Sequence, residues 1–362
     1  MQRNYGIDML RMLSMFMVVV LHVLGQGGML NNVEVFSVQY CLLWALEIAC
    51  YCAVDCFALI SGYVMYRSKA KLSKAFGLWL QVAFYTIGAV VAVAILKPEW
   101  IGLRAIANAV FPVSSGHYWY ISAYFGLLVF QPLLNVVLQY TEKKTLGTIL
   151  ITIYILFCTI PNFLMSDPYM LRNGYSTIWL VILYLTGGYI QKYDVAEKIK
   201  KSTVWWIIGI AFLLTFGFKM AVERFPQNIL AVAKFQSALV SYNSPTMVLI
   251  ALGLLIALSK QRFGKFGTKV ISWGAPAALG VYLIHTNQLV WQYLMKNLFV
   301  SLVNYHWAVM LLLVLAAAVT IYFVCTLVEK IRAWLFQLAR INILCEKLEN
   351  KIQKLLNKVI SV

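Results

Sequence analysis

The stretch from Arg3 to Leu24, RNYGIDMLRMLSMFMVVVLHVL, is long enough to cross a bilayer as one helix, yet it carries Arg11 and His22 in its apolar run. An Arg at the centre of a membrane helix costs about 2.5–3.5 kcal/mol on insertion scales, so such groups indicate a functional site. From Arg11 to His22 a helix turns to within about 20° of the same face and advances about 16 Å. One face therefore presents a cation near one membrane surface and an imidazole near the other. In the purely structural alternative, Arg11 reaches the headgroups and His22 caps the helix end.

The composition of the whole chain is typical of a polytopic membrane protein. Its 362 residues are 62% hydrophobic and only 12% charged, and the mean hydropathy is +0.79. Windows of about 20 apolar residues predict an all-α fold with about ten membrane helices. These windows cover 5–25, 42–66, 75–96, 118–140, 145–164, 176–191, 203–221, 244–259, 274–294 and 307–329. Residues 222–243 are apolar but lack the length of a span, and a re-entrant or surface helix is expected there rather than an eleventh span.

Lys and Arg are distributed unevenly between alternate loops. Most of the 30 lie in Arg3, Arg11, the loops 67–74, 141–144, 192–201 and 260–269, and the tail after Glu329. The positive-inside rule therefore predicts that both termini are cytoplasmic. The formal net charge of +17 follows from this topology and gives no reason to expect nucleic acid as a partner.

The last residues differ in pattern from the membrane segments. Residues 330–362 have apolar positions at helical spacing among Lys, Arg and Glu, which is typical of an amphipathic helix. We expect two parts, a transmembrane unit over 1–329 and a cytoplasmic tail over 330–362. The tail is expected to lie on the inner leaflet or to pair with another copy of the chain.

The cysteines do not indicate a metal site. The chain has seven, most of them in apolar segments, and no C-x-x-C motif occurs. Neither a disulfide framework nor a zinc site is predicted.

Two carboxylates lie inside the second apolar segment, at Glu47 and Asp55. A buried carboxylate needs a cation, a hydrogen-bond donor or a proton. Straight-helix geometry puts Glu47 at the depth of His22 and Asp55 about 12 Å lower. Two hypotheses follow: Glu47 orients the His22 ring, and Asp55 pairs with Arg11. The alternative is a carboxylate that reaches water at a helix end.

Small residues and basic residues follow in the same region. Ser61 and Gly62 sit inside the helix and predict close packing against another backbone. The next loop carries a basic cluster that includes Arg67 and Lys69. Such a cluster suits phosphate groups, and it equally suits anionic lipid headgroups.

Three aromatic or imidazole side chains, His117, Trp119 and Tyr120, begin the fourth apolar segment. Trp and Tyr at this position are typical of an interfacial belt. They also fit the rim of a sugar-binding site. A further histidine, His285, lies in the middle of the ninth segment, where it either contributes to a polar pocket or makes an interhelical hydrogen bond.

Together these motifs resemble the acyltransferase-3 family of integral membrane acyltransferases. The resemblance rests on GIDMLR at 6–11 followed by His22, on DCFALISGY at 55–63, and on GVYLIH at 280–285. Cys56 departs from the family, which usually has Phe at that position.

The resemblance implies an O-acyltransferase in the bacterial plasma membrane. It would move an acyl group, in this family usually acetyl, from cytoplasmic acyl-CoA to a hydroxyl of an extracytoplasmic envelope or exopolysaccharide sugar. No metal is required. His22 would be the general base or a transient acyl carrier, because imidazole has a pKa near working pH.

The other residues are expected to take roles around this reaction. On the hypotheses above, Glu47 would orient His22 and Asp55 would pair with Arg11. Donor binding would fall to Arg11, Ser61, Arg67 and Lys69. The acceptor would contact His117, Trp119, Tyr120 and His285.

A membrane transporter is the alternative from another class. Ten spans with ionisable groups inside them also describe carriers of small polar solutes or amino acids, and exporters of glycans. No inverted repeat is visible, and the ionisable residues gather in the first two spans. A carrier would show substrate flux that is independent of acyl-CoA.

Overall fold

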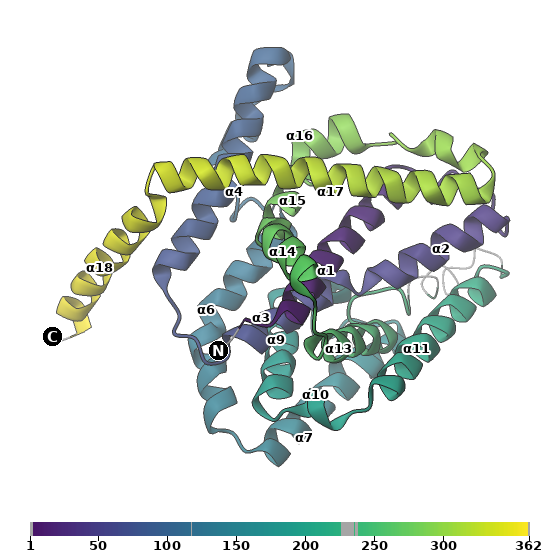
Figure 1. Cartoon of the computed structure of the whole chain (residues 1–362), viewed down its shortest axis with the longest axis horizontal. Helices are drawn as coiled ribbons and strands as arrows, with labels where there is room; N and C mark the ends of the chain where they lie inside the picture. Colours follow the sequence, from purple (N-terminus) through teal and green to yellow (C-terminus); the bar gives the residue numbers. More distant parts are fainter. Residues whose placement is uncertain (1–2, 117, 226–234, 236–237, 361–362) are drawn as a thin grey trace.

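The computed structural model describes residues 3–116, 118–225, 235 and 238–360, and its regular elements are helices (Figure 1). The helices of the first half are α1 (Tyr5–Leu24), α2 (Val38–Tyr51), α3 (Ala53–Met65), α4 (Leu72–Leu96), α5 (Leu103–Val110), α6 (Trp119–Tyr140), α7 (Lys143–Tyr154), α8 (Ile160–Leu164) and α9 (Thr177–Lys192). Those of the second half are α10 (Val195–Lys198), α11 (Lys201–Val222), α13 (Pro245–Ser259), α14 (Lys265–Gly274), α15 (Ala278–His285), α16 (Gln288–Val290), α17 (Trp307–Leu338) and α18 (Ile341–Ile360). Short 3-10 or π turns connect some of them, including η2 (Ile155–Thr159), η4 (Ala275–Ala277), η5 (Trp291–Met295) and η6 (Val300–Asn304).

Seven segments of the described chain are long and apolar enough to cross a membrane. They are Tyr5–Leu24, Val38–Met65, Leu72–Leu96, Trp119–Tyr140, Lys143–Leu164, Lys201–Val222 and Trp307–Leu338. The all-α prediction is confirmed, but the count of about ten spans is not. The windows 176–191 and 244–259 correspond to α9 and α13, which have 16 and 15 residues. A re-entrant or surface helix was expected over 222–243, and 226–234 and 236–237 of that segment lie outside the described residues.

The ninth predicted span is broken rather than continuous. Where one helix over 274–294 was expected, α15 ends at His285. The side chain of Thr286 bonds back to Tyr282 O, and the side chain of Asn287 accepts from Leu289 N. Side chains of this kind offer backbone groups an alternative to the helical bond, so the helix stops at this point.

Helix α1 runs through the middle of the molecule (Figure 1) and packs against α2, α3, α13, α15 and α17. Asn4 caps its N-terminus, because the side-chain oxygen accepts from the backbone amides of Gly6 and Ile7. The Asn4 side chain also donates to Ser259 O at the end of α13. The end of α1 that carries Arg3 is thereby fixed against a second helix.

Helices α3 and α9 cross closely at two glycines. A Cβ on Gly62 would lie 1.8 Å from Tyr184 O, and a Cβ on Gly187 would lie 2.0 Å from Leu59 O. The backbone of each helix thus packs directly against a glycine of the other helix, where no side chain keeps the two apart. The prediction of close packing is confirmed at Gly62, whereas Ser61 lines a cavity.

The segment after α15 folds back over the end of α1. Asn297 N donates to Gln26 O, and Phe299 N donates to Gly27 O. Gly28 follows with a φ of +87°, and a Cβ there would meet Asn297. Glycine permits both the backbone conformation and the close approach. This contact places η5 next to the end of α1 that carries His22.

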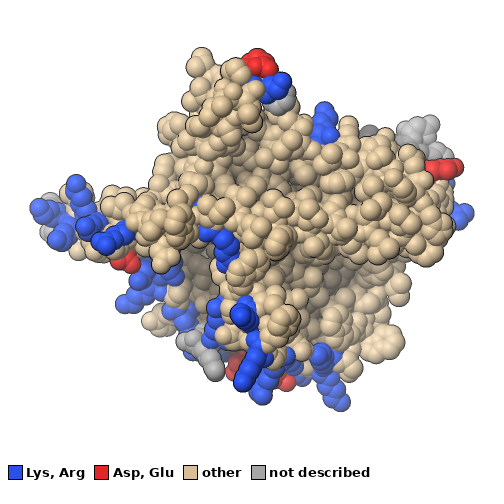
Figure 2. All heavy atoms as spheres, turned by 45° about the horizontal axis from the view of Figure 1, so that its top comes forward, with Lys and Arg blue, Asp and Glu red and all other residues tan. Residues whose placement is uncertain are grey.

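Basic side chains gather along the lower edge and on the projecting arm of the face shown in Figure 2, while a broad area between them carries other residues. Helix α17 continues beyond the expected boundary at 329 to Leu338, and α18 then projects from the rest of the molecule (Figure 1). Glu349 of α18 accepts a hydrogen bond from Leu72 N at the start of α4. The tail helix therefore supplies a cap to a membrane helix.

Candidate functional site

Two cavities meet at His22. We call them the Arg11 cavity, with about 1010 Å³ of empty space, and the Glu47 cavity, with about 1220 Å³, after a residue that lines each. Both are lined by the same five residues at their meeting point, namely Leu21, His22, Trp119, Tyr242 and Tyr282. His22 is thus exposed to two chambers with different linings.

The Arg11 cavity is largely apolar. Its polar lining groups include Arg11, Ser61 and Tyr124, and the rest of its wall is made mainly of aliphatic and aromatic side chains of α1, α3, α6 and α15. Ser61 Oγ donates to Phe57 O at 2.9 Å. A chamber of this kind suits a flexible, mostly apolar chain with a charged group at the Arg11 end.

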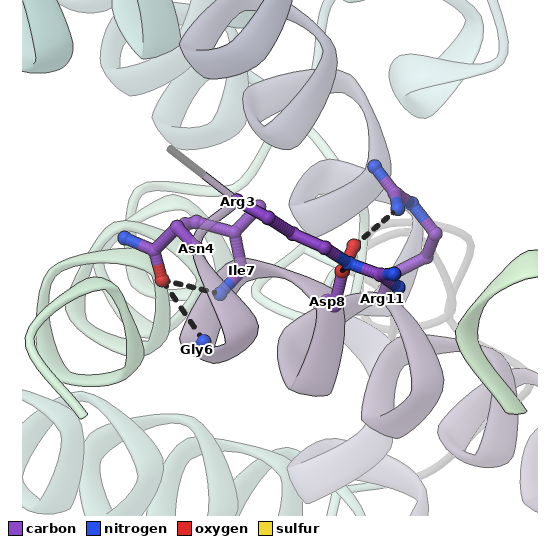
Figure 3. Close-up of polar contacts among 6 residues, drawn as sticks. All are labelled: Arg3, Asn4, Gly6, Ile7, Asp8 and Arg11. Carbon is purple, nitrogen blue, oxygen red and sulfur yellow. Dashed lines mark hydrogen bonds and ion pairs between the residues drawn. The ribbon is translucent and has the colours of Figure 1, made fainter. Parts of the chain in front are cut away.

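Arg11 is held by a carboxylate on its own helix (Figure 3). Asp8 Oδ1 lies 2.7 Å from Arg11 Nη1, and Asp8 Oδ2 lies 2.6 Å from Arg3 Nε. The Asp8 side chain is 12% exposed and the Arg11 side chain 32%. One carboxylate thus orients two guanidinium groups, and Arg11 keeps solvent-accessible surface at the cavity wall.

His22 is hydrogen-bonded to His285. His22 Nδ1 lies 2.8 Å from His285 Nε2, and His285 Nδ1 lies 2.5 Å from Val281 O. His22 Nε2 makes no hydrogen bond to the part of the chain that the structure describes. The Trp291 ring stands edge to face against the His22 ring, with centroids 4.6 Å apart. The expected orienting contact from Glu47 to His22 is therefore replaced by one from His285.

Glu47 lies on the wall of the other cavity. It is 8% exposed, and its Oε2 is buried without a hydrogen-bond partner among the described residues. A buried acceptor without a donor is costly, by about 1–3 kcal/mol, and Glu47 lines a cavity from which a bound ligand can supply the donor. The same cavity carries the side chains of Gln26, Thr286, Gln288 and Gln292.

Aromatic rings form one side of the Glu47 cavity. Trp119 and Tyr242 stack with centroids 5.9 Å apart and an interplanar angle of 22°. Tyr175 contacts both of them, at 4.4 Å from Trp119 and 4.9 Å from Tyr242. Tyr51 also contacts Tyr242. Aromatic faces beside amide and carboxylate groups form a surface suited to polar ring-shaped ligands.

Asp55 lies away from both cavities. It is fully buried and accepts a hydrogen bond of 2.9 Å from Trp179 Nε1. Arg11 has Asp8 as its ion-pair partner, so the expected pairing of Asp55 with Arg11 is replaced by a contact to the indole. Asp55 therefore ties α3 to α9 next to their crossing.

The remaining expected residues are placed at different distances from the site. Trp119 and Tyr120 line the Arg11 cavity, and Trp119 also lines the Glu47 cavity. Arg67 and Lys69 are exposed in the connection after α3, and Arg67 lies over the Tyr66 ring at 5.1 Å. His117 lies outside the described residues.

Several site residues were not expected from the sequence. Asp8 had a signal, because its spacing of three from Arg11 is that of a helical ion pair. Tyr242, Gln26 and Trp291 had none, because they reach the site only through the folding of distant segments. No group of three or more His, Cys, Asp or Glu side chains suited to a metal ion occurs in the described part of the chain.

Comparison with known protein families identifies the family of the chain. Residues 4–328 match a family model described as an acyltransferase domain, which covers nearly the whole chain. No curated protein and no solved structure matched.

Proposed function

Because the chain belongs to the acyltransferase-3 family, whose model spans residues 4–328, we propose that it is a multi-pass O-acyltransferase of the bacterial plasma membrane. It moves an acyl group, acetyl in this proposal, from cytoplasmic acyl-CoA to a hydroxyl of an envelope or exopolysaccharide sugar outside the membrane. The observation that carries the proposal is that His22 lines both cavities at their meeting point. A base at such a point can contact donor and acceptor together.

The Arg11 cavity is assigned to the donor. A guanidinium is suited to phosphate groups, and the apolar wall beyond it is suited to the pantetheine arm. Arg67 and Lys69, in the connection after α3, add positive charge for the remaining phosphates. Ser61 lines this cavity and is assigned to the thioester end of the donor.

The Glu47 cavity is assigned to the acceptor. Trp119, Tyr175 and Tyr242 line this cavity and offer flat faces for a sugar ring, and the glutamine side chains offer hydrogen bonds to hydroxyl groups. Glu47 Oε2 lacks a protein donor, and a sugar hydroxyl would supply one. A ligand with hydroxyl groups therefore fits the lining of the Glu47 cavity better than an apolar ligand does.

The reaction is base-catalysed acyl transfer. His22 Nε2 takes the proton of the acceptor hydroxyl, and the oxygen attacks the thioester carbonyl. The C–S bond then breaks, and the His22 imidazolium returns the proton to the departing thiolate. The products are an ester and free CoA, and no further reactant is needed.

The membrane orientation follows from the basic residues. We place the Arg3 end of α1 and the tail helix α18 on the cytoplasmic side. The positive-inside rule assigns both of them, together with the loops rich in Lys and Arg, to that side. The Glu47 cavity then faces outward. An acyl group would pass from one side to the other at His22.

The test is mass spectrometry of envelope glycans from cells that express the protein or its His22→Ala variant. We expect base-labile acyl esters with the intact protein and none with the variant. His306→Gln is the matched control, because His306 is exposed at the N-terminus of α17. Ester levels in His22→Ala cells equal to those of the intact protein would overturn the assignment of the base.

The family match does not favour the transporter. A transporter would give no acyl ester on any glycan and would instead show flux of a small polar solute. The same cells therefore separate the two functions.

A further inference from the structure

The second histidine of the site is buried and touches neither cavity wall. His285 is 1% exposed and is the last residue of α15. It lies outside the lining of both the Arg11 cavity and the Glu47 cavity. A side chain in this place is not positioned to bind the acceptor, which is the role expected for it from the sequence.

The two hydrogen bonds of His285 determine where its proton lies. Val281 O is a carbonyl oxygen and can only accept, so His285 Nδ1, at 2.5 Å, must donate. In a neutral imidazole the other nitrogen is then an acceptor. His285 Nε2 therefore faces His22 with a lone pair.

The position of the proton on His22 follows in the same way. Its Nδ1 lies 2.8 Å from His285 Nε2, which carries the lone pair, so His22 Nδ1 must carry a proton. In the neutral His22 ring the lone pair is then on Nε2. This is the nitrogen without a hydrogen bond in the described part of the chain, on a ring that lines both cavities.

We infer that His285 is a positioning residue that holds His22 in the tautomer with its proton on Nδ1 and its basic nitrogen, Nε2, toward the substrates. The inference rests on the proposed function, and it names a residue 263 positions away from the base. In the opposite tautomer Nε2 would carry a proton and could not accept one from a hydroxyl. The contact also suits the next step, because His22 keeps its Nδ1 proton bonded while Nε2 gains a second one.

The fold supports this arrangement on both sides. Directly after His285, Asn287 donates to Tyr118 Oη at 3.0 Å, and Tyr118 Oη donates to Leu283 O at 2.9 Å. The Trp291 ring packs edge to face against the His22 ring, and the Trp291 backbone oxygen accepts a hydrogen bond from the Gln26 side chain. Helix α15 thus ends at His285, and the residues that follow it are held by hydrogen bonds to other parts of the chain. These contacts fix the position of the His285 ring.

The experiment reads the tautomer directly, by NMR of the side-chain nitrogens of isotope-labelled histidine in the purified full-length protein. The chain has only four histidines, so substitution of each one assigns its signals. We expect the His22 signals of the unsubstituted protein to show a proton on Nδ1. A His22 signal with its proton on Nε2 would overturn the inference without any variant.

Two variants then test the role of His285. In His285→Leu the acceptor is lost, and the His22 signals should change to the other tautomer or to a mixture. In His285→Gln the side-chain oxygen can accept from His22 Nδ1, and the original tautomer should return. His306→Gln should change neither. If His285→Leu folds and leaves the His22 tautomer unchanged, the inference is wrong.

Activity supplies a second readout. General base catalysis contributes about 10²–10⁴-fold, so His285→Leu should lower kcat by about 10²-fold, with partial recovery in His285→Gln. The KM for acetyl-CoA should stay unchanged, because His285 touches neither cavity. A change in KM alone would contradict a positioning role. Because the NMR result needs no acceptor, it stands or fails independently of whether glycans are acylated.

Discussion

Asp8 decides how Arg11 is presented to the cavity. The carboxylate bonds one nitrogen of the guanidinium and leaves the group partly exposed, as described above. The Asp8 side chain is only 12% exposed, so its contact holds the Arg11 guanidinium in one position at the cavity wall. Substitution of Arg11 is therefore the direct test of donor binding.

Substitution of Arg11 should weaken donor use more than turnover. A hydrogen bond to a charged group contributes about 1.5–3 kcal/mol, so Arg11→Ala should raise the KM for acetyl-CoA by about 10- to 100-fold. Arg11→Lys should recover part of the loss, because a lysine binds phosphate as a point charge. Initial rates in proteoliposomes measure both. An unchanged KM in Arg11→Ala would remove Arg11 from the donor site.

Substitution of Glu47 should act on the other substrate. Glu47→Ala removes the buried acceptor on the wall of the Glu47 cavity, while Glu47→Gln keeps its size and one acceptor oxygen. We expect Glu47→Ala to lower glycan acylation and Glu47→Gln to have a smaller effect. The KM for acetyl-CoA is the internal control. If it rises in Glu47→Ala, Glu47 belongs to the donor site instead.

The sequence predicted some of these residues and not their partners. Arg11 and His22 were identified because two ionisable groups on one face of an apolar helix stand out from their neighbours. The contact from His22 to His285 was not predicted, because it joins segments 263 residues apart and depends on where α15 ends. Straight-helix geometry put Glu47 and His22 at similar depth, and both line the Glu47 cavity, but it gives no rotation of α2 relative to α1.

The close crossing of α3 and α9 predicts a steric effect of single methyl groups. Gly62→Ala would push a Cβ against Tyr184 O, and overpacking typically costs about 1–3 kcal/mol. Gly209→Ala in α11 is the matched control, because a Cβ there meets nothing within 4 Å. In detergent, the midpoint of thermal unfolding should fall for Gly62→Ala and stay or rise for Gly209→Ala. Equal midpoints would show that the crossing can separate without cost.

The contact between α18 and α4 predicts a dependence on pH. Hydrogen bonds from the Ser73 hydroxyl and the Leu72 and Ser73 amides hold the pKa of Glu349 below its usual value. The contact should be fully formed above about pH 4.5, where the unfolded side chain is ionised, and should weaken as pH falls through the lower pKa of the folded protein. Hydrogen exchange at Leu72 N measures this. Glu349→Gln should remove the pH dependence, and exchange that ignores pH in the unsubstituted protein would contradict the prediction.

Broken elements were the hardest to predict. Residues 274–294 are predicted as one apolar segment, because apolar residues outnumber its polar ones, which are His285, Thr286, Asn287, Gln288 and Gln292. The side chains of Thr286 and Asn287 nevertheless bond backbone and side-chain groups at the end of α15. Hydropathy windows average over such residues, so they report the total apolar length and miss the interruption.

At the scale of the molecule, the proposed orientation can be tested with reporter fusions. A fluorescent protein joined after Val362 should fluoresce, because it would stay in the cytoplasm. An alkaline phosphatase joined in the loop after α8, near Asp167, should be active, because it would be exported. The opposite pair of results would invert the membrane orientation and would assign the Glu47 cavity to the cytoplasm.

The all-helical class could be predicted, since it follows from the length of the apolar segments. The number of spans was less predictable. Helices α9 and α13 are shorter than a membrane is thick, yet many of their residues are buried against other helices. The hydropathy of one segment contains no information about the burial of that segment against other helices.

The single ring between the two cavities has a consequence for the order of events. The nitrogen of His22 that faces the substrates cannot hold an acyl group and accept a proton in the same step, and His285 Nδ1 is occupied by Val281 O. In the base mechanism proposed above no acyl group is held on His22, so both substrates are bound before either product leaves, whereas a transient acyl carrier would release CoA first. Double-reciprocal plots at several acceptor concentrations should intersect, and acetyl-CoA without acceptor should leave no label on the protein.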